Sequence, residues 1–280
     1  MSKIIPYGKH FIDEDDVNAV VNILENHQLT QGGAVDSFEK AIANYVGAKY
    51  AVAMSSWTSG LHMAYHAIGL NKTNSLITSP ITFVASSNAA FYCNSKPYFA
   101  DIDKDTINIC HKDIERQIKQ SDGTIKAIIP VHYAGLPCKM EEISKISRQY
   151  DCFIIEDAAH ALGAKYEDGS MVGSCKYSDM TGFSFHPVKS IAAGEGGMIT
   201  TNSYKIYKRL LRIRSHGINK LDDKFLDTKQ AFTGELSNPW YYEMQELGYN
   251  FRITDIQCAL GESQLKKLPS FLKKRRELAK

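Results

Sequence analysis

The sequence predicts an α/β fold in which a mixed, mostly parallel sheet is sandwiched between helices. From residue 50 to residue 158, short apolar runs of β-prone residues alternate with amphipathic stretches of helical period, as in chains whose parallel strands are joined by crossover helices. The length of 280 residues suits one large α/β domain, or one domain plus part of another. The apolar runs are strand-length, well below the roughly 18 to 20 residues that span a bilayer, so we expect no membrane partner.

Two helices are predicted at the start. The segment DEDDVNAVVNILEN begins after Ile12 with acidic residues in its first turn, and VDSFEKAIANYVGA repeats the pattern and stops at Gly47. We then predict a strand in YAVAM, a tight turn in SSWTSG, and a helix in LHMAYHAIGL that ends at Gly69 and Leu70.

The alternation continues through the middle of the chain. Strands are predicted in SLITSP, KPYFADID, IKAIIPVHYAG and CFIIEDAA, and helices between them in ASSNAAFYCN, HKDIERQIKQ and CKMEEISKISRQY. Residues 219–240 are polar and lack a clear period, which predicts an irregular loop or flap.

The final segment, ITDIQCALGESQLKKLPSFLKKRRELAK, predicts a helix that is interrupted or bent at Pro269 and ends in a basic turn. We interpret this ending as a truncation. We therefore assign residues 1–250 to a large α/β domain with an N-terminal helical segment, and residues 251–280 to the start of a smaller C-terminal domain.

Composition argues against several classes of partner. The net charge is +2 with pI ≈ 8.1, and charges of both signs are interspersed, so we expect no nucleic acid partner. The cysteines are scattered without a CxxC pair, and the N-terminal MSKIIPYGKH does not resemble a signal peptide. We expect reduced thiols, a cytoplasmic location and no metal site.

The most informative residue is Lys189, in the segment GFSFHPVKSIAAGEGG. Its glycines permit close backbone approach, and an acidic strand end, IIEDAAHALGA, precedes it. Most lysines are solvated surface charges. An amine in this compact setting is instead suited to covalent chemistry, and we interpret Lys189 as a lysine that forms a Schiff base with pyridoxal 5′-phosphate (PLP).

The turn SSWTSG lies between a strand and a helix, where free N–H groups and the helix dipole favour an anion. We predict Thr58 and Ser59 as phosphate ligands, with ordinary helix capping as an equally weighted alternative. Ser184 can donate to the same phosphate, or it is a strand hydroxyl with a local partner.

Asp157 ends the strand CFIIED, at the sheet edge where open α/β sheets usually bind ligands. A carboxylate there can keep a pyridine nitrogen protonated, although an Asp at a strand end is more often a helix cap. His160 can hydrogen bond the phenolic oxygen of the ring, whereas a lone His is more often structural.

Two further residues complete the predicted site. Phe83 follows a strand and can stack on a flat ring, although aromatic residues at such places are mostly core. Asn250 alone is best interpreted as a turn or cap residue. Few cofactors other than PLP need a phosphate cup, a ring-nitrogen carboxylate, a stacking ring and an amine together.

Motifs along nearly the whole chain resemble the DegT/DnrJ/EryC1/StrS sugar aminotransferases: QLTQGG, SSWTSGLHMA, TFVASSNA, PVHYAGLPCKM, EDAAHALGA, SFHPVKSIAAGEGG, RSHGI and ELGYNFRITDIQCALGESQLKKL. The resemblance implies fold type I of the PLP-dependent transferases, the aspartate aminotransferase-like fold, with residues 1–250 as the PLP-binding domain. It also implies a homodimer with shared active sites.

Carried over by motif, Lys189 and Asp157 are the expected catalytic residues. The expected cofactor contacts are the Schiff-base Lys189, the ring-nitrogen partner Asp157, the phenolic-oxygen contact His160, the stacking ring Phe83, the phosphate ligands Thr58, Ser59 and Ser184, and Asn250, which would reach the phosphate of the neighbouring subunit.

The segments HYAGLPCKM, SFHPVK and PWYYEMQELGYNFRITDIQCALG most resemble a branch that acts in pseudaminic acid synthesis. That branch transfers the amino group of L-glutamate, leaving 2-oxoglutarate, to C4 of a UDP-4-keto-6-deoxy-N-acetylhexosamine. The alternatives are an aminotransferase for another nucleotide 4-keto sugar, of the perosamine or aminoarabinose type, and a catalytically inactive fragment. Lys189 argues against the dehydratases of the family, which carry His there.

The sequence departs from the family pattern at three points. Trp57 replaces a small residue before the phosphate threonine, and Ala192 and Ala193 replace a common pair of threonines after the lysine. Family members also continue for roughly a hundred residues beyond Lys280, the size of an ordinary second domain, and that domain helps to close the site over the substrate.

Overall fold

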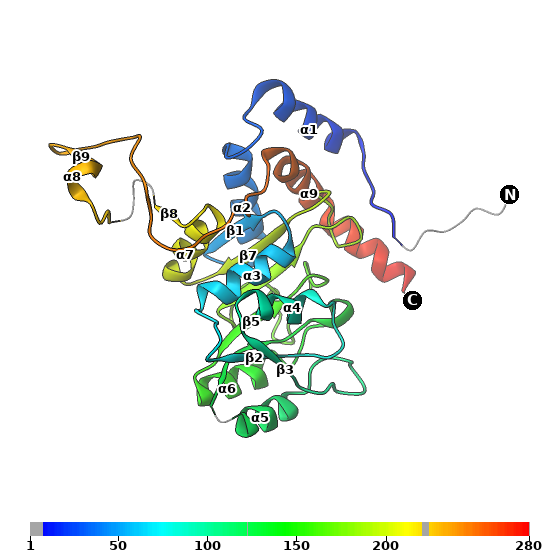
Figure 1. The fold of residues 1–280 in the computed structure, drawn as a ribbon. Helices are drawn as coiled ribbons and strands as arrows, with labels where there is room; N and C mark the ends of the chain where they lie inside the picture. The colour runs from blue at the N-terminus through cyan, green and yellow to red at the C-terminus, as the bar shows by residue number, and fades with distance from the viewer. Residues whose placement is uncertain (1–7, 122, 220–223, 280) are drawn as a thin grey trace.

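A computed structural model describes residues 8–121, 123–219 and 224–279 (Figure 1). The helices are α1 (Glu14–Asn26), α2 (Gly33–Val46), α3 (Trp57–Ala67), α4 (Ala85–Tyr92), α5 (His111–Gln120), α6 (Met140–Tyr150), α7 (Tyr204–Arg214), α8 (Thr228–Ala231) and α9 (Asp255–Leu278), with a 3-10 turn η1 (Tyr133–Gly135). The strands are β1 (Tyr50–Met54), β2 (Ser75–Thr78), β3 (Lys96–Phe99), β4 (Ile125–Ile129), β5 (Phe153–Asp157), β6 (Met180–Ser184), β7 (Gly197–Thr201), β8 (Ile218–Asn219), β9 (Phe232–Thr233), β10 (Leu236–Ser237) and β11 (Glu243–Met244).

The main sheet, within the described residues, has seven strands in the order β1-β7-β6-β5-β4-β2-β3. Strands β6, β5, β4, β2 and β3 pair in parallel, whereas β7 is antiparallel to both of its neighbours, β1 and β6. The predicted mixed, mostly parallel sheet is therefore confirmed. The antiparallel β7 was not predicted, nor was the following helix α7.

Helices cover both faces of this sheet because the buried side chains of each strand alternate between two apolar clusters. In β1, Ala51 and Ala53 pack with α2, α5, α6 and α9, whereas Val52 and Met54 pack with α3, α4 and α7. The same alternation in β5 sends its last two residues, Glu156 and Asp157, to opposite faces. The sandwich predicted from the sequence is confirmed.

Most predicted elements lie where the sequence placed them, with small shifts at their ends. Helix α1 begins after Asp13, whose side chain forms a capping box with Asp16. Helix α3 begins at Trp57 rather than Leu61. The turn motif SSWTSG therefore contains the first helical turn.

Helix α9 runs through Pro269 without the interruption that was one of the two expectations, while the other, a bend at Pro269, stays a prediction. Proline removes one helical hydrogen bond, but Leu265 and Leu268 remain buried against the cluster formed with α2. At the other end of α9, Asp255 accepts hydrogen bonds from the backbone N–H groups of Gly32 (2.9 Å) and Ala34 (3.0 Å). Packing and these anchors outweigh the local cost of the proline.

The polar stretch 219–240 was predicted to lack regular structure, and this is only partly right. Residues 220–223 of this stretch lie outside the described residues. Residues 224–240 contain the short helix α8 and the two-residue strands β9 and β10, which pair with each other, while β8 pairs with β11. Helix α8 and strand β9 project away from the main body in Figure 1. In the described parts of the chain, no helix is long and apolar enough to cross a membrane.

Candidate active site

The predicted site is built around the carboxyl end of β5. The backbone of Asp157 bonds to the chain that follows β4, donating to Pro130 O (2.9 Å) and accepting from His132 N–H (3.0 Å). Asp157 also pairs with Gly182 of β6. A carboxylate is thereby fixed at the sheet edge where parallel strands end, with only 5% of its surface exposed.

Two side chains donate to the Asp157 carboxylate, one to each oxygen. The indole N–H of Trp57, in α3, lies 2.8 Å from Oδ1, and the hydroxyl of Ser86, in α4, lies 2.8 Å from Oδ2. Hydrogen bonds of this kind favour the ionised form of a buried carboxylate. The site therefore offers a carboxylate held in one orientation by two donors.

Lys189 and His160 are brought into direct contact, with 2.7 Å between Nζ and Nε2. Partial burial lowers the pKa of Lys189, opposed by the charge of Asp157. Burial and the neighbouring Lys189 lower the pKa of His160, again opposed by Asp157. Because an ammonium group has no acceptor, Nε2 accepts this bond when Lys189 is charged, and the imidazole is then neutral with its proton on Nδ1.

The backbone of Lys189 is anchored as well. Arg275, near the end of α9, donates to its carbonyl oxygen (2.8 Å). The loop that carries the amine is therefore hydrogen bonded to α9, a helix that the sequence did not connect with Lys189.

The N-terminus of α3 lies beside the same sheet edge. A Cβ atom on Gly197 would come within 2.7 Å of the backbone of Ser56 and Trp57, so this helix end is in close contact with β7. Ser184 pairs with Gly197 across the β6–β7 ladder. The first turn of α3, with Thr58, is thus brought near the Ser184 hydroxyl.

Ser59 has a second role that the sequence left open. It forms a capping box with Ser56: the N–H of Ser59 donates to Ser56 Oγ (3.1 Å), and the N–H of Ser56 donates to Ser59 Oγ (3.1 Å). The Ser59 hydroxyl also donates to Ser56 O (2.8 Å). The capping alternative is therefore realised for Ser59. Thr58, half-buried one position earlier, is in the first turn, where helical N–H groups lack partners within the helix.

Phe83 and Asn250 lie at the rim. Phe83 is 75% exposed, and its carbonyl accepts from Ser86 N–H (3.2 Å), which places it in the turn that positions Ser86. Asn250 is exposed and forms a bridge with Ser215. The next residue, Phe251, accepts at its carbonyl oxygen from Ser55 N–H (2.9 Å), beside the α3 N-terminus.

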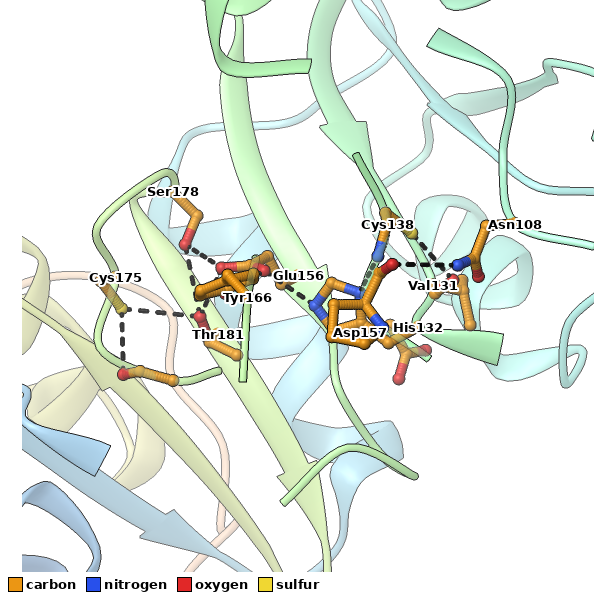
Figure 2. Close-up of polar contacts among 12 residues, drawn as sticks. Asn108, Val131, His132, Cys138, Glu156, Asp157, Tyr166, Cys175, Ser178 and Thr181 are labelled. Atoms are coloured by element: carbon orange, nitrogen blue, oxygen red, sulfur yellow. Dashed lines mark hydrogen bonds and ion pairs between the residues drawn. The ribbon is translucent and has the colours of Figure 1, made fainter. Parts of the chain in front are cut away.

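On the opposite face of β5, Glu156 is the centre of a buried polar network (Figure 2). Its carboxylate accepts from His132 Nε2 (2.8 Å), and from the hydroxyls of Tyr166 (2.6 Å), Ser178 (2.5 Å) and Thr181 (2.9 Å). Burial would raise the pKa of Glu156, but the hydrogen bond and the charge of His132, together with the hydroxyl hydrogen bonds, outweigh burial and lower the pKa. The network fixes the carboxyl end of β5 from the face opposite Asp157.

His132 donates from Nε2 to Glu156, and its Nδ1 lies 3.1 Å from the backbone nitrogen of Cys138. Burial would lower the pKa of His132, but its contacts with Cys138 and Glu156 outweigh burial and raise the pKa to about 10.

Sequence reasoning missed Trp57, Ser86, Glu156 and Arg275 as parts of the site. The alternation of faces in CFIIED was a usable signal for Glu156, since it implies a buried acid that needs partners. The other three contacts join segments far apart in the chain. The two substituted alanines, Ala192 and Ala193, are buried and place methyl groups where the family pattern has hydroxyls.

A known protein family and several known proteins match this chain. The family model "DegT/DnrJ/EryC1/StrS aminotransferase family" matches residues 10–280. The chain belongs to this family. A UDP-4-amino-4,6-dideoxy-N-acetyl-beta-L-altrosamine transaminase of Campylobacter jejuni serotype O:23/36 is 40% identical to this DegT/DnrJ/EryC1/StrS chain over 275 residues, which cover 98% of the chain and 68% of the relative.

One further relative in sequence and one solved structure also match nearly the whole chain. The uncharacterized protein MJ1066 of Methanocaldococcus jannaschii is 42% identical over 99% of the chain and 68% of its own length. The solved structure of Helicobacter pylori PseC, an aminotransferase involved in the biosynthesis of pseudoaminic acid, matches with a TM-score of 0.86 and 33% identity, over 98% of this chain and 68% of that one. Fold type I, expected from the sequence, is thus confirmed.

PLP, the cofactor expected from the sequence, is the cofactor of this aminotransferase family, and one solved structure that matches the chain, the putative sugar aminotransferase Spr1654 of Streptococcus pneumoniae, is a PLP-form. The donor set of the described site fits it. The first turn of α3 and the Ser184 hydroxyl suit its phosphate, Asp157 suits a protonated ring nitrogen, and the amine of Lys189 suits its aldehyde.

Proposed function

We propose that this aminotransferase transfers the amino group of L-glutamate to C4 of UDP-4-keto-6-deoxy-N-acetyl-β-L-altrosamine, giving UDP-4-amino-4,6-dideoxy-N-acetyl-β-L-altrosamine. The observation that carries the chemistry is the Lys189 amine, 2.7 Å from His160 and lowered in pKa by its partly buried position. The sugar is inferred from the 40% identical C. jejuni transaminase and from the PseC-like structure.

Lys189 has two tasks in this proposal. It holds the cofactor covalently before the substrate arrives, and once released it moves a proton between the substrate carbon and the carbon that carried the aldehyde. A base that cycles its proton works best when its pKa is close to the working pH. The lowered pKa of Lys189 therefore favours both tasks.

Asp157 supports the same chemistry from the other end of the ring. PLP, when bound, supplies a ring that accepts electrons from the substrate carbon. The Asp157 carboxylate would hold the proton of the ring nitrogen, and its donors Trp57 and Ser86 hold the carboxylate in one orientation. His160, beside Lys189, is placed to contact the phenolic oxygen.

For the phosphate we propose Thr58, Ser184 and backbone N–H groups at the start of α3, with Ser59 contributing chiefly by fixing that helix end. Phe83 is proposed as the stacking ring. Its side chain is largely exposed, so its face is open for stacking on the PLP ring.

We also propose a cytoplasmic homodimer with shared active sites, in which Asn250 reaches the phosphate held by the neighbouring subunit. Exposed apolar side chains at the rim support such an interface: Phe83, Val84, Phe91 and Tyr92 are each more than half exposed. Residues 1–250 would form the PLP domain of each subunit, and residues 251–280 the start of the second domain.

The decisive experiment loads the purified chain with PLP, reduces one sample with borohydride, and maps the labelled peptide by mass spectrometry. The label is expected on Lys189 and absent from Lys189→Ala. A second, unreduced sample receives L-glutamate and then the UDP-4-keto sugar; 2-oxoglutarate and the aminated sugar should form in turn. A label on another lysine, or an active Lys189→Ala variant, would remove Lys189 from the mechanism.

A further inference from the structure

Trp57 fills a slot whose walls are two glycines. A Cβ atom on Gly182, in β6, would lie 1.7 Å from the indole Cη2, and one on Gly60, in α3, would lie 2.6 Å from Cε3. Only 6% of Trp57 is exposed. The indole therefore lies flat between helix and strand, and both neighbouring positions must be glycine to admit it.

The slot aims the indole N–H at Asp157. Nε1 lies 2.8 Å from Oδ1, which also accepts the backbone N–H of Ala159 at 3.3 Å. The second oxygen accepts from Ser86 Oγ at 2.8 Å. Since α3 and α4 each supply one side-chain donor, the carboxylate cannot rotate without losing a buried hydrogen bond.

Ser86 is itself held firmly. It is fully buried, its carbonyl accepts the hydroxyl of Tyr65 (2.8 Å), and its hydroxyl lies 3.1 Å from Thr82 Oγ1. Trp57 is held by packing and Ser86 by hydrogen bonds. The two donors therefore form a preorganised clamp on one catalytic carboxylate.

We propose that Trp57 is a positioning residue that fixes the orientation of Asp157 toward the PLP ring nitrogen and shares the negative charge that its carboxylate presents to that nitrogen. Each donor stabilises the anion, so the carboxylate attracts the ring proton less strongly than an unclamped one would. This inference rests on the proposed contact between Asp157 and the ring nitrogen.

The first test needs no cofactor. The sequence has two tryptophans, Trp57 and Trp240, so Trp240→Phe leaves one indole N–H resonance in a ¹⁵N-labelled protein. Trp240 is 67% exposed, which makes this background change mild. Adding Asp157→Asn is expected to move the Trp57 resonance upfield, because a charged acceptor is replaced by a neutral one. An unchanged resonance would overturn the proposal.

The second test measures the ring nitrogen directly. Wild type, Trp57→Phe and Trp240→Phe are loaded with PLP labelled with ¹⁵N in the ring, and the ring ¹⁵N shift is followed against pH. Loss of the indole donor is expected to raise the pH at which the ring nitrogen loses its proton by about one unit. Trp240→Phe should match wild type, and Ser86→Ala, which removes the other donor, should shift in the same direction as Trp57→Phe.

An unchanged or lowered midpoint in Trp57→Phe would overturn the proposed tuning, even if its melting temperature fell, because packing alone does not raise this midpoint. If Trp57→Phe fails to fold, Ser86→Ala decides the question of tuning, and an unchanged midpoint there overturns the clamp. If the wild type binds no PLP, the proposed function fails by that result, while the indole resonance still decides whether Trp57 holds Asp157.

Discussion

Replacing Glu156 with Gln should destabilise the fold, although the two side chains have nearly the same shape. Glu156 is fully buried and accepts four side-chain hydrogen bonds. The hydroxyls of Ser178 and Thr181 can turn to accept from an amide, so Gln can be accommodated. The change therefore isolates the value of the negative charge.

The magnitude follows from the contacts. A hydrogen bond to a charged group contributes about 1.5 to 3 kcal/mol and a neutral one about 0.5 to 1.5, so four bonds lose about 4 to 6 kcal/mol in total. The smaller desolvation cost of an amide offsets several kcal/mol of this. Because the pKa of Glu156 is lowered despite burial, the balance favours the charge, and we expect a net loss of about 2 kcal/mol at pH 7.

The assay is urea unfolding followed by circular dichroism, with Glu167→Gln as the matched control at an exposed site. The control should stay within about 0.5 kcal/mol of wild type. A carboxyl with a lowered folded pKa contributes stability above its unfolded pKa and loses it as the pH falls through the folded value. The difference between wild type and Glu156→Gln should therefore shrink below about pH 4. Equal stability at pH 7, or a difference that grows in acid, would refute this reasoning.

Three further predictions concern other contacts. Arg214→Leu leaves the buried Glu39 without its ion-pair partner at 2.6 Å and should cost about 3 to 5 kcal/mol in urea unfolding; a loss below about 1 kcal/mol would contradict it. Gly197→Ala places a Cβ atom 2.7 Å from the backbone at the start of α3 and should raise the PLP dissociation constant about tenfold or more, whereas Gly33→Ala, with nothing within 4 Å, should leave it unchanged. Asp16→Asn weakens the contacts of α1 with Lys267 and Gln264 of α9 and should lower stability by about 1 to 2 kcal/mol, measured by thermal melting; an unchanged melting temperature would count against these contacts.

The sequence predicted the βα alternation well because each strand and helix carries its own periodic pattern. YAVAM and CFIIED are short and apolar, and both form strands of the expected extent. The antiparallel β7 was missed because its direction is set by pairing with β1 and β6, which no local pattern encodes. Helix α9 continues through Pro269 because tertiary packing overrides a local preference.

In the candidate site, too, local motifs were predictable from the sequence, whereas contacts between distant segments were not. The Lys189 and Asp157 motifs were visible in the chain, and the structure places Lys189 beside His160, as their separate motifs could not show. Trp57 was noticed only as an oddity, since its contact with Asp157 spans 100 residues of sequence and depends on glycines at two other positions. Contacts of that kind are properties of the packed molecule.

Helix α9 also connects the backbone of the reactive lysine, Lys189, to the start of α2. Asp255, in the first turn of α9, accepts hydrogen bonds from the start of α2, and Arg275, twenty residues later, donates a hydrogen bond to the carbonyl oxygen of Lys189. At 1.5 Å per residue these two anchors are about 30 Å apart on one rod. One helix thus links the start of α2 to the backbone of the residue that carries the reactive amine.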